Sequence, residues 1–223
     1  MRNNIWHHIS TSFVIQYLIF GIVLIFIFYR RSAKIKYTNE YTAVKPFVWL
    51  MFIGGVYELV FTTILFVQTA FWHSLYGLLE FLVFNYLLYR ILGKYTRMYV
   101  AFTILFLFFY ISSLFYWSID NHNQMEGYYA ALETVFVMIW AVLWFKDLFK
   151  GDELISLWKI PAFYFVIGII LYLCGGVVPS LVTPYLFKVT GLWTKYWLVF
   201  LFLGTIMRVM MIIGLLKATV KKP

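Results

Sequence analysis

Long apolar runs separated by short polar breaks dominate the chain. A run of about 20 apolar residues is enough to cross the hydrocarbon core of a membrane as a helix. The runs are continuously apolar, which favours helices over the alternating pattern of β-barrel strands. The sequence therefore predicts an all-α, polytopic membrane protein, a single bundle over 1–223 with seven transmembrane helices, at about 10–29, 46–68, 71–92, 98–119, 127–147, 159–180 and 192–217.

The composition supports this class. Hydrophobic residues make up 64% of the 223 residues and charged residues only 12%, which is about half the charged share of a soluble domain. So few polar residues leave too little polar surface to cover the chain in water, and lipid is the solvent that fits. The single cysteine, Cys174, excludes a disulfide framework and a multi-cysteine metal site.

The basic residues predict the orientation of the bundle. Cytoplasmic loops carry an excess of lysine and arginine, and most of the 18 such residues fall on one side of the predicted spans: Arg30, Arg31, Lys34, Lys36, Lys45, Arg90, Lys94, Arg97, Lys146, Lys150, Lys159, Lys217, Lys221 and Lys222. This places the N-terminus outside and the C-terminus in the cytoplasm, in a bacterial-type cytoplasmic (inner) membrane. Because topology accounts for the net charge of +9, the lipid bilayer is the expected partner and nucleic acid is not.

Three acidic residues lie inside the predicted spans. Glu58, Glu80 and Glu133 belong to the second, third and fifth spans, and a charge at the centre of a membrane helix costs about 2.5–3.5 kcal/mol on insertion scales. A rise of about 1.5 Å per residue puts them roughly 9–15 Å below the outer ends of their helices. We therefore expect the three carboxyls in one layer of the outer half, with at least one protonated at neutral pH.

Tyrosine and histidine residues accompany these acids. Tyr76 precedes Glu80 by four residues and Tyr129 precedes Glu133 by four, a spacing that puts each phenol on the face of its carboxyl. His73 lies on the same face as Glu80. The pattern predicts an outward-open polar cavity lined by Glu58, Glu80, Glu133, Tyr76, Tyr129 and His73, which binds a cation or small polar ligand or passes protons. The alternative is that each acid only holds neighbouring helices together by hydrogen bonds.

Two further polar residues lie deeper. Asn85 in the third span and Arg208 in the seventh reach similar depths, so a contact between them is expected toward the inner side. His73, Glu80 and Glu133 are residue types that bind metals, but no HExxH motif or close-spaced histidine pair accompanies them. No metal and no cofactor is therefore expected.

A few segments carry a resemblance to a known group. They are Trp72-His73-Ser74-Leu75-Tyr76 through Glu80-Phe81 with Tyr86 and Tyr89, then Phe163–Gly176, and the lysine-rich ending after Leu215-Leu216. In these the chain resembles uncharacterised bacterial seven-helix membrane proteins of the kind found beside, or fused to, signalling proteins. The resemblance implies a signalling context and assigns no catalytic residue.

Three functions remain in order of preference. The first is a non-enzymatic sensing or accessory module that binds a small ligand, ion or lipid group in the carboxylate layer and signals to a cytoplasmic or membrane partner. The second is a cation- or proton-coupled transporter, or a homo-oligomeric pore or effector. The third is an intramembrane lipid-modifying enzyme with Glu80 and His73 as acid and base, which ranks last because no nucleophile or metal motif accompanies them.

Overall fold

The structure, a computed structural model, describes residues 2–32, 39–65, 67, 70–118, 122–150, 156–186 and 192–218. These residues form helices and turns, with no strand among them. The elements are α1 (Arg2–Ser32), α2 (Asn39–Tyr57), the π-helix η1 (Glu58–Ile64), α3 (Ala70–Leu92), α4 (Thr96–Leu114), α5 (His122–Leu148), the 3₁₀-helix η2 (Leu157–Lys159), α6 (Pro161–Leu186) and α7 (Leu192–Lys217).

The apolar runs form helices, as the sequence predicts, but some helix bounds differ from the predicted ones. The predicted span 192–217 coincides with α7. The span 46–68 divides at Glu58, where α2 passes into a π-helix of 7 residues. The helix α5 begins before its apolar run, at His122, because a helix can extend beyond the hydrocarbon core of the membrane.

Six helical segments are long and apolar enough to cross a membrane, by length and composition: Thr42–Phe61, Phe71–Leu92, Thr96–Leu114, Met125–Leu148, Pro161–Val182 and Leu198–Lys217. The helix α1 contributes a shorter apolar stretch, Val14–Arg30. The all-helical bundle fits a multi-pass membrane protein.

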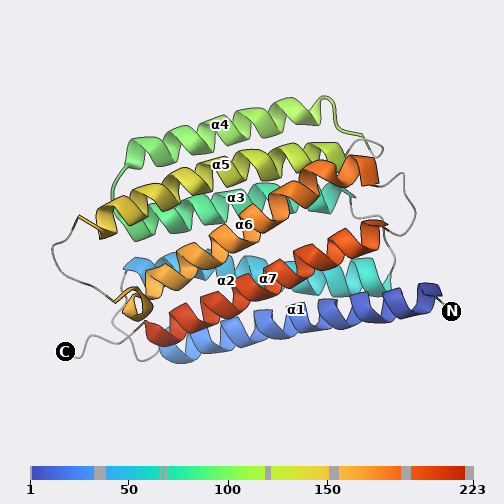
Figure 1. The fold of residues 1–223 in the computed structure, drawn as a ribbon, viewed down its shortest axis with the longest axis horizontal. Coiled ribbons are helices and arrows are strands. Elements are labelled where there is room, and N and C mark those ends of the chain that lie inside the picture. The colour runs from blue at the N-terminus through green and yellow to red at the C-terminus, as the bar shows by residue number, and fades with distance from the viewer. Residues whose placement is uncertain are drawn as a thin grey trace.

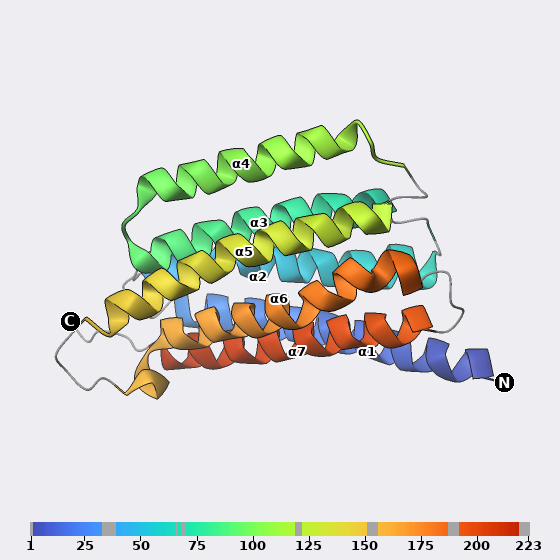
Figure 2. The same ribbon diagram turned by 45° about the horizontal axis from the view of Figure 1, so that its top comes forward.

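Six of the helices form a closed ring. Around the ring, α1 packs on α2, α2 on α3, α3 on α5, α5 on α6, α6 on α7, and α7 on α1. The helix α4 lies outside it and contacts α3 and α5, as its place at the edge of the bundle in Figures 1 and 2 shows. Successive helices run in opposite directions, so the two termini lie at opposite ends of the bundle (Figure 1). We call these the N-terminal end and the C-terminal end.

The C-terminal end of the bundle is basic. The helices α1, α3, α5 and α7 end there and α2, α4 and α6 begin there, which gathers the basic residues of these helix ends on one side: Arg30, Lys45, Arg90, Lys94, Arg97, Lys146, Lys150, Lys159 and Lys217. The asymmetry that the sequence predicts thus corresponds to one physical end of the bundle.

Glycines allow the helices of the ring to approach closely. A Cβ on Gly55 would lie 3.2 Å from the Leu18 Cα of α1, and one on Gly54 would lie 2.8 Å from the Tyr76 ring of α3. On α6, a Cβ on Gly175 would lie 2.7 Å from Leu203 of α7. Small residues at such contacts are typical of membrane helices, whose association depends on close packing.

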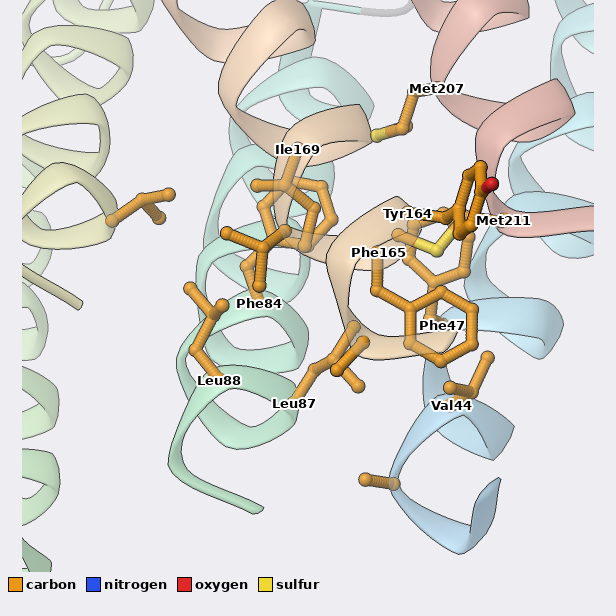
Figure 3. Close-up of a cluster of buried hydrophobic side chains, with 14 of the residues drawn as sticks. Val44, Phe47, Phe84, Leu87, Leu88, Tyr164, Phe165, Ile169, Met207 and Met211 are labelled. Carbon is orange, nitrogen blue, oxygen red and sulfur yellow. The ribbon is translucent and has the colours of Figure 1, made fainter. Parts of the chain in front are cut away.

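The ring is filled near its C-terminal end by large apolar side chains from four helices. Figure 3 shows this group, which we call the C-end core: Val44 and Phe47 from α2, Phe84, Leu87 and Leu88 from α3, Tyr164, Phe165 and Ile169 from α6, and Met207 and Met211 from α7. Phe47 and Phe84 stack with ring centroids 5.8 Å apart. The chain is therefore closely packed between mid-depth and its basic end.

Candidate functional site

Four polar side chains from four helices meet at mid-depth in the ring. We call Glu80 of α3, Glu133 of α5, Tyr172 of α6 and Arg208 of α7 the mid-depth group. The side chains of Glu80, Glu133 and Arg208 are 7%, 3% and 0% exposed. The Tyr172 hydroxyl donates a hydrogen bond to Glu80 Oε2 at 3.3 Å. Each of these helices is apolar over most of its length, so the group is a local exception.

The two carboxyls of this group are close enough to act on one another. The charge of Glu80 acts on Glu133, and the guanidinium of Arg208 acts on Glu80. Arg208 also donates from Nη1 to the Gly204 carbonyl oxygen at 3.0 Å. The Oε1 atoms of both Glu80 and Glu133 are buried without a hydrogen-bond partner. Buried polar atoms normally have partners, so these two oxygens indicate a place for a proton or another ligand.

A second polar group lies toward the N-terminal end. We call Glu58 of η1, His73 of α3 and Glu126 of α5 the N-end group. Glu58 Oε1 lies 3.9 Å from His73 Nδ1, and the charge of Glu58 acts on Glu126, whose Oε1 is buried without a hydrogen-bond partner. Glu58 is the first residue of the π-helix. Such irregular turns occur often at functional sites.

The structure divides the three predicted carboxyls between these two groups. Glu58 lies with His73, and Glu80 lies with Glu133. His73 precedes Glu80 by two helical turns, which is about 11 Å along α3 at about 5.4 Å per turn. The three acids were expected in a single layer, and the structure places them at two levels instead. The distance of a residue from the end of its own helix does not fix its level in the bundle, because neighbouring helices begin at different levels.

Tyr76 and Tyr129 have partners other than the acids four residues away. The Tyr76 hydroxyl donates to Met51 Sδ of α2 at 3.9 Å, and Tyr129 shares a short hydrogen bond with the Ser113 hydroxyl of α4. Both phenols thus connect neighbouring helices. The residue that donates to Glu80 is Tyr172 instead.

Asn85 belongs to a separate network. Its Oδ1 accepts from Trp140 Nε1 of α5 at 2.7 Å, and its Nδ2 donates to Thr103 Oγ1 at 2.9 Å and to the Tyr99 carbonyl at 3.3 Å. These bonds connect α3 with α4 and α5. Asn85 and Arg208 therefore have different partners, and the expected contact between them is replaced by this network and by the action of Arg208 on Glu80.

Sequence reasoning missed Tyr172 and Glu126. Tyr172 lies in the middle of an apolar span, away from the aromatic belts where membrane tyrosines concentrate, and that position was the available signal. Glu126 lies just before the predicted span 127–147, so it is not among the acids that the sequence predicts inside the spans. Because α5 begins at His122, Glu126 is within the helix, where the charge of Glu58 in η1 acts on it.

Neither metals nor known relatives add to this site. Among the residues that the structure describes, no group of three or more His, Cys, Asp or Glu side chains is arranged to hold a metal ion. Comparison of the chain with protein-family models, curated proteins and solved structures finds no match. The resemblance to seven-helix proteins near signalling genes stays a prediction.

Proposed function

We propose that this protein is a non-enzymatic sensing or accessory module of a bacterial-type cytoplasmic membrane. It spans the membrane seven times, with the basic C-terminal end of the bundle in the cytoplasm and the N-terminal end outside. It binds a proton, a small cation or a small polar ligand at the mid-depth group and transmits occupancy through helix movement to a cytoplasmic or membrane partner. The outward-open cavity that the sequence predicts belongs to this proposal.

The observation that carries the proposal is the convergence of four helices on the mid-depth group. Each of α3, α5, α6 and α7 contributes one polar side chain, and two of the carboxyl oxygens are buried without a partner. A change of charge at this point changes the attraction among all four helices at once. Intramembrane ionisable groups commonly mark ligand sites or proton relays.

The C-end core favours sensing over conduction. Phe47, Phe84 and Leu87 are fully buried between the mid-depth group and the basic end. A conducting path needs water or polar groups on both sides of its binding site, whereas a sensor needs access from one side only. The N-end group provides polar side chains on the other side.

The test uses the full chain in lipid nanodiscs. Hydrogen–deuterium exchange of α3, α5, α6 and α7, expressed as protection relative to the intrinsic amide exchange rate at each pH, is measured over a pH series and over series of sodium and potassium chloride. We expect exchange in these helices to change with at least one variable in the wild type, and the change to disappear in Glu80→Gln and Glu133→Gln. The matched control Asp147→Asn removes an acid at the basic end and should keep the response. Exchange that is constant under every condition would exclude the proposal.

Transport of protons or cations is the second candidate. It is favoured by the two levels of acids, since the N-end group lies about 11 Å outward of Glu80 along α3. Proteoliposomes carrying the protein would then show a proton or cation flux that disappears in Glu80→Gln and Glu133→Gln. Absence of flux, together with an exchange response, would favour sensing.

A further inference from the structure

The 3₁₀-helix η2 is attached to two helices at the C-terminal end of the bundle. The backbone carbonyl oxygen of Trp158 accepts a hydrogen bond from the Tyr164 hydroxyl of α6 at 3.0 Å and another from Lys217 Nζ of α7 at 2.7 Å. The Lys217 ammonium group also lies over the Tyr164 ring, 5.1 Å from its centroid. Two donors from two helices therefore fix the position of η2.

The side chain of Trp158 faces outward although its carbonyl is held. Trp158 is 64% exposed, and its ring packs edge-on against Phe163 with centroids 5.3 Å apart. The next residue, Lys159, is also exposed. An ammonium group has three donors, and Lys217 uses one of them for the Trp158 carbonyl. We call Trp158, Lys159 and Lys217 the η2 surface, which offers one indole and two ammonium groups.

The ends of the apolar spans fix the level of this surface in a bilayer. The span in α6 begins at Pro161, and the span in α7 ends at Lys217. Trp158 therefore lies just before one span and Lys217 at the last residue of the other. Tryptophan concentrates at the level of the lipid headgroups, and lysines at helix ends extend their ammonium groups to the same level. The η2 surface therefore lies where the hydrocarbon core meets the headgroups.

The charge of the η2 surface favours an anionic lipid. At the same end of the bundle, Asp147 lies 2.9 Å from Lys94 and 4.0 Å from Lys150, so this carboxylate belongs to the ends of α3 and α5. Among the residues that the structure describes, no carboxylate forms an ion pair with Lys159 or Lys217. The phosphate of an anionic phospholipid carries a negative charge that no ammonium group of the same molecule balances, and basic residues at the membrane surface attract such lipids.

We propose that the η2 surface binds the headgroup of an anionic phospholipid. The ammonium groups of Lys159 and Lys217 attract the phosphate, and the Trp158 indole lies beside the glycerol and the upper part of the acyl chains. A protein partner would have to cover Trp158 from the water, whereas the span ends place this ring at the level of the lipid. The inference goes beyond the proposed function and does not depend on binding at the mid-depth group, so either can fail without the other.

Native mass spectrometry of the full chain in detergent tests the inference. The chain is titrated with phosphatidylglycerol and with phosphatidylcholine of the same acyl chains, and the Kd of the first bound lipid is measured. We expect the wild type to prefer phosphatidylglycerol by about tenfold, and Lys159→Gln or Lys217→Gln to weaken its binding by about fivefold each. Phosphatidylcholine should bind all variants about equally. Lys217→Arg keeps the charge and should keep the affinity.

The matched control is Arg97→Gln, which removes an exposed cation of α4 at the same end of the bundle. This control should change the Kd for phosphatidylglycerol by less than about twofold, because salt screens charges that are far from the site. Gln at position 217 keeps an N–H donor for the Trp158 carbonyl, and circular dichroism checks the folding of each variant. If Lys217→Gln does not fold, Lys159→Gln, at an exposed side chain, still decides the question.

The level of Trp158 is measured independently in phosphatidylglycerol vesicles. Tryptophan fluorescence is quenched by lipids brominated near the headgroup or near the chain ends, and by iodide in the water. The difference between the wild type and Trp158→Phe isolates the contribution of Trp158. We expect this contribution to be quenched most strongly by the bromines near the headgroup.

Four results would overturn the inference. The first is equal affinity of the wild type for the two lipids. The second is a loss in Arg97→Gln as large as in Lys159→Gln and Lys217→Gln, which would show a general attraction to the basic end. The third is displacement of phosphatidylglycerol by an equal concentration of inorganic phosphate, which would assign the site to a free anion. The fourth is a Trp158 contribution quenched by iodide and not by bromine, which would favour a protein partner in the water.

Discussion

The two halves of the helix ring differ in how they are held together. The C-end core consists of large apolar side chains from α2, α3, α6 and α7 that fill the ring, whereas the other half contains two groups of acids with unpartnered oxygens. In lipid, apolar side chains gain little by leaving the solvent, so close packing provides the attraction between helices. The comparison teaches that close apolar packing is concentrated in one half, and that the other half carries the buried acids to which we assign binding in our proposal.

The largest expected effect is in the C-end core. Phe84→Ala removes a fully buried ring that stacks on Phe47. We expect a loss of about 2–4 kcal/mol in the free energy of unfolding, in the lower part of the usual Phe→Ala range because the unfolded side chain meets lipid rather than water. The matched control is Phe108→Ala on α4, where the ring is 70% exposed. Equal losses in the two variants would remove the basis for the comparison.

An intermediate effect is expected for the network of Asn85. Asn85→Leu leaves the buried Trp140 indole N–H without its acceptor, which should cost about 1–2 kcal/mol of unfolding free energy. Thr103→Val is the milder control, because Asn85 Nδ2 retains its bond to the Tyr99 carbonyl. Reversible unfolding in mixed micelles measures both. If Thr103→Val lowers the unfolding free energy as much as Asn85→Leu does, the contact of Asn85 with α4, and not its bond to the indole, provides the stabilisation.

The acids of the mid-depth group should contribute less to stability. Glu80→Gln and Glu133→Gln keep the shape of each side chain, and each removes one of the two buried acids that act on one another. We expect unfolding free energies within about 1 kcal/mol of the wild type, together with loss of the response to pH. Destabilisation as large as that of Phe84→Ala would make these acids part of the scaffold and would weaken the division between the halves.

The smallest effect is expected at the surface of the basic end. Lys94 Nζ lies 2.9 Å from Asp147 Oδ2, and this hydrogen bond raises the pKa of Lys94 above its ordinary value. The stabilisation is therefore fully present below the ordinary pKa of a lysine and is lost as the pH rises through the folded-state value. Lys94→Met should remove this alkaline part of the pH–stability profile. Lys150, at 4.0 Å from the same carboxyl, serves as the control, and a larger change in Lys150→Met would contradict the assignment.

The axial positions of the helices could be predicted from the sequence. The apolar runs locate α3 and α7 within a residue or so of their bounds, because hydrophobicity over a span is a strong local signal. The division of span 46–68 at Glu58 could not be predicted, since a π-helix depends on what η1 packs against. The early start of α5 was missed for a related reason, because polar residues at a helix end carry no apolar signal.

The sides of the helices that face one another could not be predicted. Glu80 and Glu133 were identified as buried acids, and the structure brings them within electrostatic reach of one another. The two residues that act on Glu80, Tyr172 and Arg208, come from α6 and α7, and the places of these helices follow from the order of helices around the ring. Nothing local in an apolar span specifies that order, and for the same reason the exclusion of α4 from the ring was not anticipated.

Closure of the ring by α1 and α7 has a consequence for how the protein is made. During synthesis α7 is the last of the seven helices to leave the ribosome, so the earlier six enter the membrane while the ring has a gap. Until α7 is in place, Glu80 lacks the guanidinium of Arg208. Chains that end before α7 cannot close the ring. They should therefore be degraded faster in the cell than the chain that includes α7.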